Sequence, residues 1–260
     1  MNSINIGVFG PAGRMGQDVI QQLKNFNSFE LSYLCEKKGH RSVGKRIFEM
    51  QVEDNIDELI KKSDVIIDFT IPLATINLLE KMNKVKNPPA LVTGTTGYSR
   101  SEEKKFYSLL KGKTILRSFN MSIGVNLLKK IVSFTAKNIG HKSDIEILEV
   151  HHNKKKDIPS GTALSLADSV TEGNTNIKKY SYREKNNNNV RRKNEIGFAS
   201  IRGGDVVGEH SVFFFLDGEQ IELKHIASDR KIFSMGAIEA ARWLHKRKPG
   251  LYTIMDMVDS

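Results

Sequence analysis

The chain is 260 residues long, and its 39% apolar and 27% charged residues are typical of a globular protein. No apolar run approaches the roughly 20 residues of a membrane span, and residues 1–6 lead into a strand-like run rather than a secretory signal. A single cysteine, Cys35, excludes an internal disulfide framework, and its neighbour Glu36 favours a buried structural thiol over a nucleophile. The sequence therefore predicts a cytoplasmic protein with no membrane partner.

The net charge of +10 comes from 40 basic and 30 acidic residues. Such an excess fits either nucleic acid or an acidic small molecule as partner. The lysines are scattered along the whole chain, and no zinc-finger spacing, basic zipper or aromatic-interleaved basic patch is present. A general lysine bias therefore explains the charge better than nucleic-acid binding, and no nucleic-acid partner is expected.

Apolar runs alternate with segments of helical periodicity over the first 120 residues. The run Val65-Ile66-Ile67 is continuous, which favours a strand that is buried on both faces. Strands and helices that alternate in this way predict an α/β fold, a Rossmann-type doubly wound parallel sheet. Strands are expected at residues 4–10, 29–35, 65–69 and 90–94, and helices at residues 15–23, 73–82 and 101–110.

The pattern changes after about residue 121, where strand-like runs become crowded. Asp217-Gly218 separates two of these runs and is a signal for a tight hairpin. Residues 185–193, rich in asparagine, are expected to form a polar loop. The pattern predicts a second α+β domain with a mixed or antiparallel sheet. Strands are expected at residues 145–150, 197–202, 209–216 and 220–227, and helices at residues 124–139, 163–170 and 236–244.

A glycine-rich turn follows the first expected strand and opens the first expected helix. Residues 10–16 read Gly-Pro-Ala-Gly-Arg-Met-Gly, with glycines three apart instead of the usual dinucleotide spacing. Glu36 ends the second strand at about the distance expected of an acid that binds an adenosine ribose. Lys37 and Arg14 are instead suited to a 2′-phosphate, although a solvated turn also explains Lys37. This combination predicts a dinucleotide site that accepts both NADH and NADPH.

A second cluster of glycines and hydroxyls, residues 93–97 (Thr-Gly-Thr-Thr-Gly), follows a later expected strand. At the carboxyl end of a parallel strand it would border the nucleotide crevice, whereas an ordinary turn is the simpler interpretation.

Residues 151–163 read His-His-Asn-Lys-Lys-Lys-Asp-Ile-Pro-Ser-Gly-Thr-Ala and connect an expected strand to an expected helix. Ser160 suits a helix cap, and the helix start favours anions. Because residues four apart share a side in a helix or a strand, His151 and Lys155 are expected to face one cleft. Imidazoles, ammonium groups and a helix start together suit a small molecule with several carboxylates. A solvated basic loop is the alternative interpretation.

Three motifs together resemble the 4-hydroxy-tetrahydrodipicolinate reductase (dihydrodipicolinate reductase) family of the lysine and diaminopimelate pathway. They are residues 10–16, the Gly-Thr-Thr-Gly segment at 94–97, and the segment Glu-Val-His-His-x-x-Lys-x-Asp-x-Pro-Ser-Gly-Thr-Ala that ends at Ala163. The resemblance extends over nearly the whole chain, including residues 119–126 and 204–210. It implies reduction of 4-hydroxy-tetrahydrodipicolinate to tetrahydrodipicolinate by hydride from NADH or NADPH.

The resemblance also implies roles for matching residues. His151 would be the general acid and Lys155 its partner, and the cyclic dicarboxylate substrate would be bound by His152, Ser160, Gly161 and Thr162. The pyrophosphate would lie against residues 10–15, and the adenosine ribose against Glu36 and Lys37. The full set expected at the cofactor is Gly10, Pro11, Ala12, Gly13, Arg14, Met15, Glu36, Lys37, Gly94, Thr95, Thr96, Ser118, Phe119, Asn120 and Met121.

The implied organisation is a dinucleotide-binding domain, residues 1–121, joined by a final helix within residues 231–260. Residues 122–230 would form the substrate-binding and oligomerisation domain of a homotetramer. Lys37 and Ile71 depart from the family pattern, since arginine is common at the first position and a basic residue occurs at the second. No metal is expected, because adjacent histidines lack further ligands at suitable spacing. A nicotinamide-dependent reductase of another imino or oxo acid, or a dinucleotide sensor without catalysis, remains an alternative.

Overall fold

The computed structural model describes residues 3–177, 179–182 and 190–260, so residues 185–189 of the predicted asparagine-rich loop lie outside the described residues. The chain divides into two compact units. Unit 1 comprises Met1–Ile123 and Lys231–Ser260, and unit 2 comprises Gly124–Arg230. None of the helices among the described residues combines the length and apolar character that a bilayer span requires.

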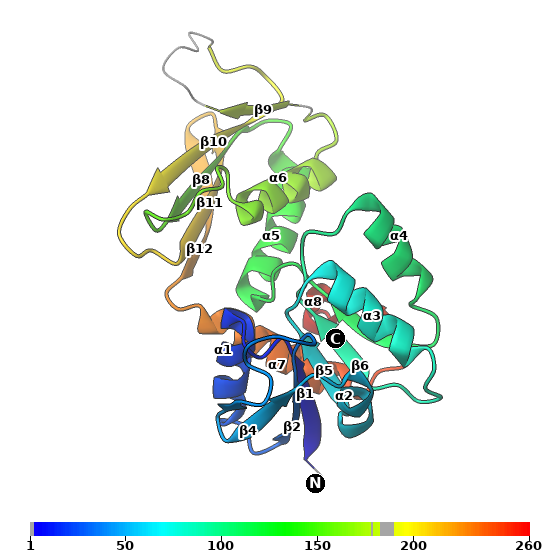
Figure 1. Cartoon of the computed structure of the whole chain (residues 1–260). Coiled ribbons are helices and arrows are strands. Elements are labelled where there is room, and N and C mark those ends of the chain that lie inside the picture. The colour runs from blue at the N-terminus through cyan, green and yellow to red at the C-terminus, as the bar shows by residue number, and fades with distance from the viewer. Residues whose placement is uncertain (1–2, 178, 183–189) are drawn as a thin grey trace. The chain divides into compact units, whose positions relative to one another are not determined.

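Unit 1 contains a sheet in the order β13-β7-β6-β5-β1-β2-β4-β3, in which only the pairing of β3 with β4 is antiparallel; Figure 1 labels β6, β5, β1, β2 and β4 of this sheet. This order confirms the predicted Rossmann-type sheet. The elements are β1 (Ile4–Phe9), α1 (Arg14–Leu23), β2 (Phe29–Cys35), β3 (Arg46–Ile47), β4 (Met50–Glu53), α2 (Ile56–Lys62), β5 (Val65–Asp68), α3 (Pro72–Met82), β6 (Ala90–Thr93), α4 (Arg100–Ser108), β7 (Thr114–Arg117), α7 (Lys231–Leu244), β13 (Gly250–Tyr252) and α8 (Ile254–Val258).

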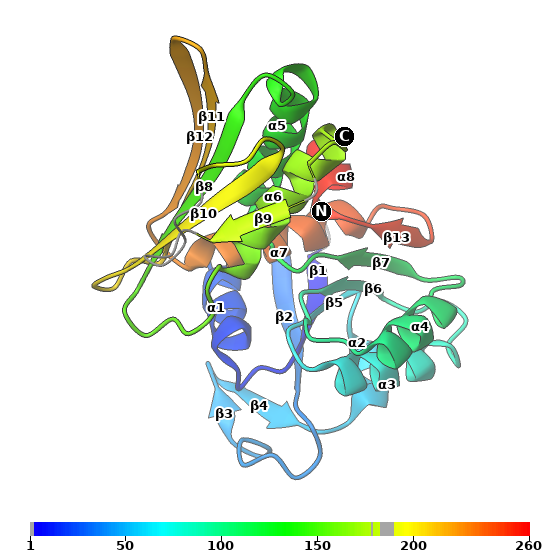
Figure 2. The ribbon, with the colours of Figure 1, turned by 90° about the horizontal axis from the view of Figure 1, so that it is seen from above.

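Helices cover both faces of this sheet, as Figure 2 shows. In β5, Val65 and Ile67 pack with α1 and α7, whereas Ile66 packs with α2, α3 and α4. Both faces are therefore apolar, which explains why β5 is a continuous apolar run rather than an alternating one. Cys35 is buried on the second of these faces, and burial raises the pKa of its thiol to about 12.

Unit 2 contains a five-stranded sheet in the order β12-β11-β8-β10-β9. β8 pairs in parallel with β10 and antiparallel with β11, so the sheet is mixed, as predicted. Asp217-Gly218 forms the tight turn between β11 and β12, with Gly218 at φ +82°. The elements are α5 (Ile123–Ile139), which begins in unit 1, β8 (Asp144–His151), α6 (Gly161–Gly173), β9 (Lys179–Tyr182), β10 (Glu195–Arg202), β11 (Gly208–Leu216) and β12 (Glu219–Ala227).

α5 and α6 cover one face of the sheet in unit 2 (Figure 1). Their apolar side chains pack on Ile145 and Ile147 of β8 and on Val212 and Phe214 of β11. Because side chains alternate along a strand, Glu149 and His151 point to this same helix-covered face. The sequence thus places an acid and an imidazole at the end of an otherwise apolar row.

Candidate functional site

The glycine turn of unit 1 lies between β1 and α1, where it was predicted. Gly10 has φ +85°, a conformation that favours glycine. A Cβ on Gly16 would lie 2.2 Å from the Gly10 carbonyl oxygen, so only glycine permits this close packing of helix on turn. The N-cap residue of α1, Gly13, provides no side-chain hydrogen bond, and the first turn carries no acid. The amides at this helix start suit a phosphate group.

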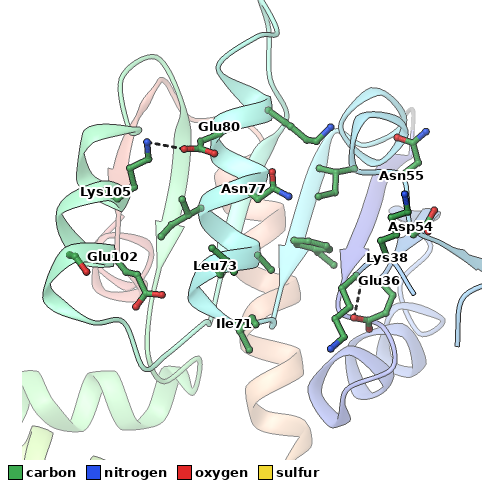
Figure 3. Close-up of a pocket in the computed structure, with 17 residues that line it drawn as sticks. Glu36, Lys38, Asp54, Asn55, Ile71, Leu73, Asn77, Glu80, Glu102 and Lys105 are labelled. Carbon is green, nitrogen blue, oxygen red and sulfur yellow. Dashed lines mark hydrogen bonds and ion pairs between the residues drawn. The ribbon is translucent and has the colours of Figure 1, made fainter. Parts of the chain in front are cut away.

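A cavity of 1050 Å³ lies in unit 1 and is drawn in Figure 3. Glu36, Lys37 and Lys38 line it from the end of β2, and Asn77 of α3 lines it from the helix side. The Glu36 carboxylate accepts a hydrogen bond from the Lys37 amide at 3.0 Å, while Lys37 and Lys38 are exposed. At the β2 end of the cavity, the carboxylate of Glu36 and the ammonium groups of Lys37 and Lys38 fit an adenosine ribose with or without a 2′-phosphate. Ile71, where the family allows a basic residue, lines the cavity with an apolar side chain.

The loops after β6 and β7 place only some of the predicted cofactor residues at an accessible surface. Thr96 is exposed and Gly94 half-buried, but Thr95 is buried, with its hydroxyl donating to Asp68. A Cβ on Gly94 would lie 2.2 Å from the Phe69 ring, so glycine is required there.

Residues 118–121 follow β7 and differ strongly in exposure. Phe119 is 65% exposed, whereas the Met121 side chain is 2% exposed and packs in the core of unit 1. Ser118 and Asn120 are half-buried, and the Ser118 hydroxyl donates to the Asn120 carbonyl at 2.7 Å. Met121 can therefore contribute to a cofactor site only through its backbone.

In unit 2, His151 ends β8 and is held by a buried carboxylate. His151 is 7% exposed and Glu149 0% exposed, and the imidazole Nδ1 is hydrogen-bonded to that carboxylate. Arg202 of β10, paired opposite His151, donates two hydrogen bonds to the same carboxylate at 2.7 and 2.9 Å. Because a carboxylate only accepts, Nδ1 carries the proton and Nε2 is the atom available for chemistry. Nε2 lies beside Gly208, where an added Cβ would come within 3.0 Å of it.

The charges around His151 set its acidity. Burial of the ring lowers the pKa of His151, Glu149 opposes this shift, and the ammonium of Lys155 lowers the pKa further. Burial raises the pKa of Glu149, but the hydrogen bonds from Arg202, Ser200 and His151 outweigh burial and bring it below its usual value. Glu149 therefore remains a carboxylate and stabilises the protonated imidazole of His151.

His152 and Lys155 belong to the loop that follows β8. The prediction that His151 and Lys155 face one cleft assumed a regular strand or helix, and that reasoning is wrong, because residues 152–160 form neither. The two side chains nevertheless interact electrostatically. The Lys155 ammonium pairs with Asp157 at 2.9 Å, and the half-buried His152 accepts the Lys154 amide at 3.2 Å.

The start of α6 adjoins this loop. Ser160 caps the helix by accepting the Ala163 amide at 3.1 Å, as its position in the sequence predicted. A Cβ on Gly161 would meet nothing within 4 Å, so the space beside the first helical residue is open. Thr162, the next residue, is half-buried. The helix start is thus accessible to a carboxylate.

His210 of β11 connects the helix start with His151. Its Nε2 lies 3.0 Å from the Ser160 hydroxyl oxygen, and its ring packs edge-on against the His151 ring at a centroid distance of 5.0 Å. Burial, followed by the charge of His151, lowers the pKa of His210 to about 4. His210 is therefore neutral near pH 7 and adds no repulsive charge beside His151.

We expect the buried His210 to make the protein less stable in mild acid. Its pKa is about 4 when folded and 6.5 as a reference, so the unfolded chain binds more protons between these values. Stability should therefore fall as the pH drops from about 7 toward 4, by up to about 3 kcal/mol from this residue. Urea unfolding of the wild type and His210→Gln between pH 7 and 5 measures the effect. A variant with the full wild-type slope would contradict the assignment.

Sequence reasoning missed Glu149, Arg202 and His210. Glu149 lies two residues before His151, in the buried phase of a strand, and that phase was a signal for it. Arg202 is 53 residues from Glu149 and His210 is 50 from Ser160, and only the strand pairing brings them together.

Two family models match the two parts of the chain. The family model described as "Dihydrodipicolinate reductase, N-terminus" matches residues 4–121, and "Dihydrodipicolinate reductase, C-terminus" matches residues 124–258. The chain is 41% identical to a 4-hydroxy-tetrahydrodipicolinate reductase of Nitratiruptor sp. over 97% of this chain and 98% of that protein. It is 40% identical to one of Pelagibacter ubique over 100% and 99% of the two chains.

A solved structure supports the fold. The dipicolinate-bound dihydrodipicolinate reductase from Paenisporosarcina sp. TG-14 has a TM-score of 0.79 and 24% identity, covering 96% of this chain and 97% of that one. The family models span both units, and the relatives match at nearly full length. The chain therefore belongs to the dihydrodipicolinate reductase family, the nicotinamide-dinucleotide-dependent oxidoreductases of lysine and diaminopimelate biosynthesis.

Proposed function

We propose that the chain reduces 4-hydroxy-tetrahydrodipicolinate to tetrahydrodipicolinate with NADH or NADPH. The observation that carries this proposal is the group formed by His151, Glu149 and Arg202 beside Lys155 and the start of α6. That group combines a proton donor with features that bind carboxylates. Loss of the 4-hydroxyl as water leaves a conjugated ring, to which one hydride and one proton then add at adjacent carbons.

The proton is assigned to Nε2 of His151. Nδ1 is committed to Glu149, so protonation of Nε2 produces an imidazolium whose charge the carboxylate balances. Because burial lowers the pKa of His151, this imidazolium is a readier proton donor than an exposed one. A bound dicarboxylate would place negative charge near His151 and raise its pKa again. Substrate binding would therefore itself favour protonation of His151.

Binding of the substrate carboxylates is assigned to the surrounding cations and amides. Lys155 and His152 would bind anionic groups directly, and the backbone of Gly161 and Thr162 would bind a carboxylate at the helix start. The Ser160 hydroxyl is already shared between the Ala163 amide and His210, so its role would be to position the helix start.

The dinucleotide is assigned to unit 1, with pyrophosphate at residues 10–15 and adenosine in the cavity beside Glu36. When bound, the nicotinamide supplies the hydride. Glu36 suits the ribose hydroxyls that NADH retains, and Lys37 and Lys38 suit the 2′-phosphate of NADPH. Lysine binds phosphate as a point charge rather than through two parallel hydrogen bonds, so we propose use of both cofactors.

The test of the proposed function is turnover of enzymatically generated 4-hydroxy-tetrahydrodipicolinate, followed by oxidation of NADPH and then of NADH. Both cofactors should be oxidised. Oxidation only with other imino or oxo acids would favour a different reductase. Dinucleotide binding without oxidation on any imino dicarboxylate would favour a sensor.

The paired lysines of the cavity should set the affinity for NADPH. Replacing both Lys37 and Lys38 by alanine should raise the KM for NADPH about tenfold and leave that for NADH nearly unchanged. Lys84→Ala, an exposed charge outside the cavity lining, is the matched control. Equal changes for both cofactors would reject the assignment of the 2′-phosphate to these residues.

We propose a homotetramer assembled through the sheet of unit 2, in the cytoplasm. The face of this sheet opposite α5 and α6 carries apolar side chains, of which Ile201, Phe215 and Ile226 are 50%, 39% and 55% exposed. Exposed apolar side chains on a sheet face suit burial against other copies. Sedimentation should give four times the mass of one chain, and a monomer would contradict the proposal.

A further inference from the structure

Asp68 is a fully buried carboxylate at the carboxyl end of β5, and no role has been assigned to it so far. β5 lies between β1 and β6 in the sheet. One oxygen of Asp68 accepts from the Thr70 amide at 3.0 Å and the Thr70 hydroxyl at 2.6 Å. The other accepts from three hydroxyls, those of Thr75, Thr93 and Thr95, at 2.6, 2.8 and 3.2 Å. Five donors thus converge on one side chain.

These donors come from α3, from β6 and from the loops after β5 and β6. Thr70 belongs to the loop after β5, Thr75 to the first turns of α3, and Thr93 and Thr95 to β6 and the loop after it. The Asp68 carbonyl also accepts the Gly94 amide at 2.9 Å. Thr70 in turn lies against the glycine turn, since a Cβ on Gly10 would lie 2.9 Å from its methyl group. Asp68 therefore contacts the loops after β5 and β6 directly, and through Thr70 it adjoins the glycine turn.

The arrangement is costly for stability alone. Burial raises the pKa of Asp68, and the threonine hydrogen bonds oppose this shift without cancelling it. All five donors are neutral, and within the described ranges 3–177, 179–182 and 190–260 Asp68 forms no ion pair. A buried charge without a cation is expensive, and an apolar residue would fill the same space at less cost. The hydrogen bonds of this carboxylate instead fix the positions of the loops that donate to it.

The topology indicates which part of a ligand these loops border. A ligand of such a sheet binds outside the carboxyl ends of the strands, where the strand order reverses. With pyrophosphate at the glycine turn after β1 and adenosine beside β2, the remaining nucleoside lies over β5 and β6, on the other side of β1. We propose that Asp68 is a positioning residue for the nicotinamide half of the dinucleotide, acting through residues 69–71 and 94–96. This inference rests on the proposed cofactor site.

The test compares binding of NADPH with binding of 2′-phospho-ADP-ribose, which lacks nicotinamide. In Asp68→Asn, two donors would face an amide NH₂ group, so the loops should shift. The Kd for NADPH should rise about tenfold while that for 2′-phospho-ADP-ribose stays at the wild-type value. Asp64→Asn is the matched control, because Asp64 accepts the Asn5 amide at 2.8 Å just before β5, at its opposite end. It should lower the thermal midpoint without changing either affinity.

A second pair of variants tests the hydroxyl network itself. Thr75→Ser keeps a donor and should retain wild-type NADPH affinity, whereas Thr75→Val removes it and should weaken NADPH binding selectively. Equal weakening of both ligands in Asp68→Asn, or unchanged affinity for both, would overturn the positioning role. A wild-type chain that bound neither ligand would instead overturn the proposed cofactor site.

Discussion

Replacing His151 by glutamine should lower kcat by at least about a hundredfold, because an amide cannot donate the proton that an imidazolium donates. Glutamine retains a hydrogen-bonding group toward Glu149, so the fold of unit 2 should persist. The KM for the dinucleotide should stay constant, because its assigned residues all belong to unit 1. Steady-state kinetics with saturating NADPH would measure the loss. His141→Gln, an exposed histidine of the same unit, is the control and should keep wild-type kcat.

A second measurement separates proton donation from simple binding. NMR titration of His151 should show a higher pKa in the presence of a dicarboxylate analogue than in its absence. An unchanged pKa would reject the proposal that substrate binding favours protonation of His151. A His151→Gln variant with wild-type kcat and a raised substrate KM would assign His151 to binding alone.

Replacing Glu149 by glutamine should affect both activity and stability. Without the negative charge the imidazolium of His151 is less stable, so kcat near pH 7 should fall by roughly tenfold or more. Part of the loss should return at lower pH, where His151 is protonated again. Arg202 would be left without its carboxylate, and breaking a buried pair of this kind costs about 3–5 kcal/mol.

The double variant Glu149→Gln, Arg202→Met distinguishes the two effects. Removing the stranded guanidinium should restore much of the stability measured by urea unfolding, whereas kcat should stay low. Recovery of both together would show that Glu149 acts only by stabilising unit 2. A Glu149→Gln variant with an unshifted pH profile would contradict the electrostatic role.

The sequence predicted the long elements well because their patterns are strong. The continuous apolar run in β5, the Ser160 cap of α6 and the Asp217-Gly218 hairpin all lie where predicted. The missed elements are all short: among them, β4 and β7 have four residues each, β13 has three, and α2 has seven residues capped by Asn55. Segments of this length carry too few apolar positions to show a period.

In the candidate site, too, the sequence predicted some residues and not others. His151 and Lys155 were singled out by their residue types within the strand–loop–helix segment, whereas the spacing argument was wrong because residues 152–160 form neither a helix nor a strand. Arg202 and His210 were not, since their importance depends on which strands lie beside β8. For Thr95 and Met121, burial decides whether a loop residue faces solvent or the interior, and a short motif carries no information on burial.

The ion pair between Lys155 and Asp157 has a consequence for selectivity. Asp157 is largely exposed, so the pair contributes little stability and is readily exchanged. In the structure the lysine ammonium is held by this aspartate at 2.9 Å. In the proposed site, an incoming anion would displace Asp157 at small cost and would then pair with the ammonium of Lys155. A weakly charged or singly acidic molecule gains too little from this exchange, so the loop itself would discriminate in favour of diacids.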